Sequence, residues 1–199
     1  KAVTILLHKC KEYLLVCDKI SKKISTEVDR IVEQIQTNGI GQEKNSRGLN
    51  PFPHVTDLTM DCGTFLGAAK RAIYSICELP AIFFALEDID NNFVSLASRL
   101  AAKFDHNNPL LNFITSNANH IKHIIELRNF HEHTKTKQTI IENFRCTPSI
   151  QIIVPQWYVT GGEARPIKEE MEAIVNYLLE IAEAMLIHLV MANVKKEFP

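Results

Sequence analysis

The stretch VTILLHKCKEYLLVCDKISKKISTEVDRIVEQIQ, residues 3–36, carries the pattern that decides the fold class. Its apolar residues recur in steps of three and four, which places them on one side of an α-helix. They are Leu6, Cys10, Tyr13, Cys17, Ile20, Ile24, Val28, Ile31 and Ile35. At ~1.5 Å per residue, this helix is about 50 Å long. A long helix with one apolar stripe is typical of a helical bundle.

The same periodicity returns in four later segments and predicts a helix in each. They span about residues 57–77, 91–104, 109–132 and 166–196. Asn91 and Asn92 are suitable N-cap residues for the helix that follows them. Asn108, followed by Pro109 at the first helical position, suits the next start. Pro80 is expected to interrupt or end the helix before it, because proline lacks a backbone N–H group.

Two parts of the chain lack the helical period. Residues 37–56 combine glycine, proline and charge, which predicts a loop. Residues 134–165 predict a loop with a short extended insertion, because SIQIIVPQWYVTGG (149–162) is β-branched, aromatic and ends in two glycines. We therefore predict one domain over residues 1–199. Its fold class is mainly α, a bundle of about five helices with a short β-like insertion near 148–160.

Composition and charge restrict the function classes. The net charge of -1 and the pI of about 6.8 argue against a protein that is basic overall, but they leave a local basic patch open. No uninterrupted apolar run reaches ~18 residues, and the first apolar segment contains Lys, His and Glu, unlike a signal peptide. Five cysteines without a C-x-x-C pair favour reduced, buried thiols. We expect a cytoplasmic protein without a membrane partner.

The sequence lacks the common signatures of metal and nucleotide chemistry. No glutamate has a histidine three residues later, so the di-iron pattern of helical bundles is missing. There is also no Gly-rich phosphate loop, no H-E-x-x-H and no G-x-S-x-G. His120 and His123 are three residues apart, but zinc normally requires a fuller ligand set, which favours exposed histidines. We predict no metal and no cofactor.

The segment ELRNFHEHTKTK, residues 126–137, contains the strongest polar signal. The apolar positions of the fourth predicted helix are Leu111, Ile114, Ala118, Ile121 and Ile125. The next position in that series is Arg128, so its side chain is expected to point toward the bundle. A buried guanidinium is costly unless it is paired or lies at an opening. Arg128 is therefore either a structural residue, paired with an acid such as Glu126 or Glu132, or part of a cleft.

The order Arg128, Asn129, then His133 after four intervening positions resembles the motif of the HEPN superfamily. In that family an Arg, often followed directly by Asn or Asp, precedes a His by four to six residues. The family is an all-α bundle with the motif near the end of a late helix and another long helix after it. The order of predicted helices here is similar, whereas the β-like insertion is not part of the family's core pattern.

The resemblance implies a function and a set of roles. Many members of the family are metal-independent ribonucleases of the toxin or defence type, which act as dimers with two motifs at one cleft. By this resemblance His133 is the general base for the 2′-hydroxyl, Arg128 clamps the phosphate and Asn129 orients a partner. His131 is a second candidate acid or base. Its expected partners are RNA, a second copy of the chain and an antitoxin protein.

Two lysines after the motif are further candidate site residues, and the resemblance also leaves a second function open. Lys135 and Lys137 lie just after the motif and are candidate contacts for the RNA backbone. Other members of the family are binding or dimerisation modules rather than nucleases. A non-catalytic helical dimer that binds a protein, nucleotide or small ligand is therefore the alternative function.

Overall fold

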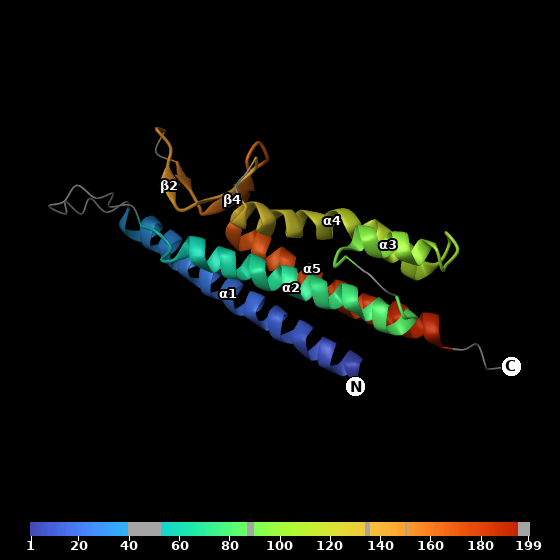
Figure 1. The fold of residues 1–199 in the computed structure, drawn as a ribbon. Helices are drawn as coiled ribbons and strands as arrows, with labels where there is room; N and C mark the ends of the chain where they lie inside the picture. The colour runs from blue at the N-terminus through green and yellow to red at the C-terminus, as the bar shows by residue number, and fades with distance from the viewer. Residues whose placement is uncertain (40–52, 87–89, 134–135, 150, 195–199) are drawn as a thin grey trace.

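The computed structural model describes residues 1–39, 53–86, 90–133, 136–149 and 151–194, which form five helices and two small sheets (Figure 1). The helices are α1 (Ala2–Asn38), α2 (Leu58–Phe84), α3 (Phe93–Ala101), α4 (Pro109–Glu132) and α5 (Ile167–Asn193). The two sheets lie between α4 and α5 in the chain. The prediction of a mainly α fold with a short β insertion is confirmed.

The helices pack around one continuous apolar core. α2 contacts α1, α4 and α5, and α3 packs on α4. The predicted stripe of α1 is buried except at Tyr13, which is half-buried. Phe65, Ile73 and Ile76 of α2 and Leu178 of α5 are fully buried in the same core. The start of α1 and the end of α5 lie at one end of the bundle, and the strands lie at the other (Figure 1).

Helix starts follow the predicted caps. The side chain of Asn92 accepts a hydrogen bond from the Ser95 amide at 2.8 Å. Asn108 accepts from the amides of Leu110 and Leu111, with Pro109 at the first position of α4. These bonds satisfy amides that have no partner within the helix.

The expectation that Pro80 interrupts or ends α2 is wrong. Pro80 is buried inside the helix, which continues to Phe84. The helix ends there because the next residue, Ala85, has a left-handed backbone with a φ of 48°. A proline removes one helical hydrogen bond, but apolar contacts on both sides of it hold the helix together. Leu79 lies in the apolar core, and the neighbouring Pro80 is buried beside it.

The insertion lies where the sequence predicted it, and its strands also extend before and after the predicted β-like part near 148–160. It contains β1 (Thr139–Glu142), β2 (Arg145–Cys146), β3 (Ile152–Ile153), β4 (Gln156–Val159) and β5 (Arg165–Pro166). One antiparallel sheet has the order β1-β4-β5, and the other pairs β2 with β3. The predicted loop at 37–56 falls mostly on residues 40–52, which lie outside the described residues.

The insertion closes the end of the core at which α4 stops. Trp157 of β4 is 1% exposed, and its ring centroid lies 6.2 Å from that of Phe65 in α2. Thr139 of β1 is also buried, and its hydroxyl donates to the carbonyl of Leu127 in α4 at 2.8 Å. The insertion therefore belongs to the core and fixes the end of the helix that carries the motif.

Helix α5 is the one described helix long and apolar enough to cross a membrane by length and composition. It also contributes a stripe to the bundle, with Met171, Leu178, Met185 and Leu189 fully buried. A core helix meets the same criteria of length and composition, so this feature is weak evidence for a membrane span.

Four of the five cysteines are buried thiols, as predicted. Burial raises the pKa of Cys10 to about 11 and the pKa values of Cys17 and Cys62 to about 12, because it penalises the thiolate. These thiols are therefore poor nucleophiles. Cys146 in β2 is exposed.

Candidate functional site

A groove of about 860 Å³ opens between α2 and the end of α4, with one wall from α1; we call it the α2–α4 groove. The charged and titratable residues that line it are Lys70, Arg71, Arg128, His131 and Glu132. Three of these side chains are cationic, one is a carboxylate and one is a histidine. The polar motif therefore meets two basic residues of α2 that are distant in sequence.

Arg128 lies at the edge of the core rather than inside it. The buried residues in this part of α4 are Ile121, Ile124 and Leu127, so the core stripe runs one position earlier than the sequence series predicted. The Arg128 side chain is 23% exposed and lines the groove. Ile124 and Ile125 are both apolar, and the sequence alone did not show which of them continued the stripe.

The guanidinium of Arg128 has one acidic partner. Its Nη2 atom forms an ion pair with Glu132 one helical turn later. Its Nε atom is buried and has no hydrogen-bond partner among the described residues. Both sequence interpretations of Arg128 therefore find support, since it is paired with a predicted acid and also lines a cleft.

Asn129 holds a lysine of the neighbouring helix. Its Oδ1 atom accepts a hydrogen bond from Lys70 Nζ at 2.7 Å. The same ammonium lies 5.4 Å from the centroid of the Tyr74 ring. Asn129 itself does not line the groove, and its contribution to the groove is to position Lys70.

The two histidines of the motif occupy different environments. The imidazole of His131 packs on Gly63 of α2 so closely that a Cβ at position 63 would lie 2.8 Å from its Cε1 atom. His131 lines the groove, whereas His133 caps the end of α4 with a side chain that is 72% exposed. The His133 Nε2 atom is 4.0 Å from Glu132. The structure thus brings Arg128 and His131, but not His133, to the groove.

Of the two lysines predicted after the motif, the structure describes Lys137, which does not line the groove. Lys137 is exposed, and its Nζ atom lies 5.8 Å from the centroid of the Phe130 ring. Lys135 lies outside the described residues.

Sequence reasoning missed the contribution of α1 and α2. Lys70, Arg71 and Tyr74 come from α2, and Tyr13 comes from α1. The Arg71 guanidinium lies 5.9 Å from the centroid of the Tyr13 ring. The available signal was the non-core face of α2, where Gly63, Gly67, Lys70 and Tyr74 recur at helical spacing.

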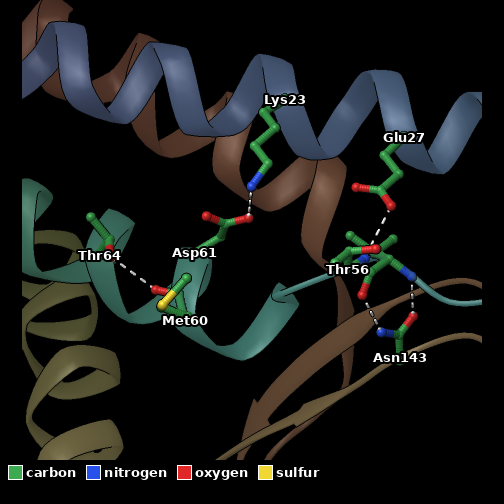
Figure 2. A network of polar contacts seen from close by, with 8 residues as sticks. Lys23, Glu27, Thr56, Met60, Asp61, Thr64 and Asn143 are labelled. Carbon is green, nitrogen blue, oxygen red and sulfur yellow. Dashed lines mark hydrogen bonds and ion pairs between the residues drawn. The ribbon is translucent and has the colours of Figure 1, made fainter.

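Polar contacts fix the start of α2, where the groove begins (Figure 2). Lys23 of α1 donates to Asp61 at 2.6 Å, and this hydrogen bond raises the pKa of Lys23. Glu27 accepts from the Thr56 amide at 3.0 Å. Asn143, which follows β1, exchanges two hydrogen bonds with the backbone of Val55. The start of α2 is therefore held by both α1 and the insertion.

Comparison of the chain with known protein families, curated proteins and solved structures found no match. Within the described residues, no group of three His, Cys, Asp or Glu side chains is placed to hold a metal ion. The HEPN resemblance therefore rests on Arg128, Asn129 and His133 together with the order of the helices.

Proposed function

We propose that the protein is a HEPN-like, metal-independent endoribonuclease of the toxin or defence type, and that its RNA lies in the α2–α4 groove. The observation that carries the proposal is the meeting of Lys70, Arg71 and Arg128 at one groove beside His131. Each RNA phosphate carries a negative charge, and Arg and Lys are the side chains that bind it best. Glu132 is the only carboxylate among the described lining residues, so the cations outnumber it.

The residue types fit a cleavage that requires no metal. The 2′-hydroxyl of RNA attacks the adjacent phosphate when a base removes its proton, and the 5′-oxygen of the next nucleotide leaves. A neutral histidine is a suitable base near pH 7. The Arg128 guanidinium would stabilise the charge that develops on the phosphoryl oxygens. Asn129 would keep the Lys70 ammonium in place for the same phosphate.

The two histidines are rival candidates for the base. His133 has the spacing of the family motif, and His131 lies in the groove beside Arg128. We assign the base to His131 if the substrate occupies the groove as it stands, since a base must reach the proton that it removes. His133 takes this role if a second copy of the chain brings its own groove to the exposed imidazole.

The deciding experiment measures RNA cleavage in EDTA. We expect the wild-type protein to cut mixed RNA and to leave a 2′,3′-cyclic phosphate or its hydrolysis product. Arg128→Ala should reduce the rate by ~10²–10³, and loss of the true base by ~10²–10⁴. His131→Ala and His133→Ala, compared side by side, identify that base.

Arg30→Ala is the matched control for Arg128→Ala. Arg30 is an exposed arginine of α1 whose guanidinium donates to Gln34 one turn away, at 3.3 Å, its one partner in the part of the chain that the structure describes. This variant should cut RNA at the wild-type rate. If the wild-type protein leaves every RNA intact, the ribonuclease proposal is wrong.

One observation favours a non-catalytic binding module as the second candidate. Glu132 forms an ion pair with the Arg128 guanidinium, and among the described residues the only polar contact of the exposed His133 side chain is with the same carboxylate, at 4.0 Å. Such an arrangement stabilises the end of α4 and needs no catalytic role. In that case Arg128→Ala would lower the melting temperature, because it leaves Glu132 without its partner, and no RNA would be cut.

We also propose a homodimer. A second groove of about 360 Å³ runs between α1 and α5, and most of its lining residues are apolar. Leu15 and Leu179 border it with about half of their surface exposed. Exposed apolar side chains of this kind mark interaction surfaces. Light scattering should give a dimer at micromolar concentration, and a monomer would contradict the proposal. The antitoxin partner and the cytoplasmic location stay predictions.

A further inference from the structure

Two tyrosines line the α2–α4 groove, and one of them, Tyr13, also packs against the apolar core. Tyr13 of α1 and Tyr74 of α2 are both half-buried there. Neither hydroxyl has a hydrogen-bond partner among the described residues, whereas Tyr177 donates to Asn117 at 2.9 Å and Tyr158 to Glu142 at 3.2 Å. Both tyrosines border the groove, so a ligand that occupies the groove can contact them.

Each of these rings lies beside a cation. Lys70 Nζ is 5.4 Å from the centroid of Tyr74, and the Arg71 guanidinium is 5.9 Å from the centroid of Tyr13. Proteins that bind single-stranded nucleic acid combine these two elements, with cations along the backbone and aromatic rings on which successive bases stack. A site for a lone phosphate would need the cations but not the rings.

The floor of the groove has a glycine that the fold does not require. Gly67 lies in the middle of α2, and a Cβ added there would meet nothing within 4 Å. Glycine in a helix interior lowers helix stability, and it is used where another group must approach the backbone closely. The missing side chain leaves open space at this point of the groove.

The lining residues of α2 form an extended row, which suits a nucleic-acid strand better than a single phosphate. Gly63, Gly67, Lys70 and Tyr74 follow one another at intervals of three and four residues, so they lie along one face of the helix. From Gly63 to Tyr74 the face is about 16 Å long at ~1.5 Å per residue. His131 lies at the Gly63 end, and the tyrosines lie toward the other, beside Lys70 and Arg71.

From this arrangement we infer that the groove takes an unpaired RNA strand, with its phosphates on Lys70, Arg71 and Arg128 and its bases on the rings of Tyr13 and Tyr74. The inference rests on the proposed function and names its substrate class. In a duplex the bases are already stacked on one another, so the two rings would have no partner. The α2–α4 groove therefore discriminates against paired RNA.

The test measures binding, independently of cleavage. The probes are a fluorescent strand of 2′-O-methyluridine, which has no 2′-hydroxyl to attack the phosphate, an abasic strand of the same length, and a 2′-O-methyl RNA duplex. We expect the full chain to bind the uridine strand more tightly than either of the others. Tyr13→Ala and Tyr74→Ala should each weaken binding of the uridine strand roughly 5- to 150-fold and leave binding of the abasic strand unchanged.

Two kinds of control separate stacking from folding. Tyr13→Phe and Tyr74→Phe keep the ring and should bind like the wild type, and thermal melting verifies that all variants fold. Tyr158→Ala removes a tyrosine of the insertion that does not line the groove, and it should not change the affinity.

The outcomes distinguish this inference from the ribonuclease proposal. Equal affinity for the uridine and abasic strands, or duplex binding as tight as strand binding, overturns the inference even if natural RNA is cut. Binding that depends on the tyrosines supports it even if no RNA is ever cut. A wild-type protein that binds none of the three probes overturns it as well.

Discussion

The insertion and the α2–α4 groove use similar residues in opposite ways. In the insertion, Glu142 accepts a hydrogen bond from Gln156 at 2.5 Å and another from Tyr158 at 3.2 Å. The same carboxylate forms an ion pair with Arg145 at 3.2 Å. These four polar side chains have their partners inside the insertion, so their chemistry serves the fold, although the buried Nε1 atom of Trp157 has no partner among the described residues.

The groove leaves its polar groups incompletely paired. Three cations face one carboxylate, and the buried Nε atom of Arg128 has no hydrogen-bond partner among the described residues. Unpaired polar groups weaken a fold unless water or a ligand satisfies them. The comparison teaches that substitutions in the insertion should reduce stability, whereas substitutions in the groove should reduce binding.

The largest effect on stability is expected from Trp157→Ala. Its ring is 1% exposed and packs near Phe65, so its removal should cost ~3–5 kcal/mol and lower the melting temperature by about 6–20 °C. Trp157→Phe should retain most of the stability, since the indole Nε1 atom has no partner among the described residues. Arg71→Ala in the groove is the comparison, with a cost below ~1 kcal/mol. Equal losses of stability for Trp157→Ala and Arg71→Ala would contradict the assignment of the insertion to the fold and of the groove to binding.

The next effect separates two glycines of the same helix face. A Cβ at position 67 meets nothing, so Gly67→Ala should stabilise α2 by ~0.5–1 kcal/mol. A Cβ at position 63 lies 2.8 Å from the His131 ring, so Gly63→Ala must displace that imidazole. Melting curves and cleavage assays on the two variants give the result. We expect Gly63→Ala to lose activity without the gain in stability, and full activity would show that the place of His131 is unimportant.

How far the sequence predicted the fold and the site depends on the range of the contacts. The helices and their caps were predictable because periodicity and capping are local, as with Asn92 and Asn108. The predicted series of core positions in α4 was wrong by one residue at Arg128, since Ile124 and Ile125 are equally apolar and either could continue it. The meeting of Lys70 with Asn129 was not predictable, because nothing local relates residues on two different helices.

A smaller effect is expected from a substitution of Glu132, the one carboxylate among the described residues that line the groove. Glu132→Gln removes the charge that pairs with Arg128, which frees the guanidinium for a phosphate. An exposed ion pair contributes ~0.2–1 kcal/mol, so affinity for RNA should rise by about 1.4- to 5-fold and depend more steeply on salt. Glu126→Gln on the same helix is the control, since Glu126 pairs with Lys122 outside the groove. Unchanged affinity in both variants would mean that phosphate does not compete with Glu132 for Arg128.

The smallest effect concerns the charge of Glu142 in the insertion. The hydrogen bond from Gln156, with Arg145 and Tyr158 as further contributors, lowers the pKa of this carboxyl below its usual value. A group whose pKa is lowered by folding stabilises the protein above its unfolded pKa, ~4.3 for glutamate, and this contribution disappears as the pH falls through the folded pKa.

Glu142→Gln keeps the size of the side chain and removes its charge. At pH 7 it should therefore lower the free energy of unfolding, by less than ~1 kcal/mol because the carboxylate is partly exposed and screened by solvent. The difference from the wild type should shrink as the pH falls from 5 to 3, the range of ~4.3 and below in which glutamate takes up its proton. Denaturant titrations at the two ends of this range measure it. RNA affinity at pH 7 should stay at the wild-type value, since Glu142 does not line the groove. A loss of affinity without a loss of stability would reverse the assignment of the insertion to the fold and the groove to binding.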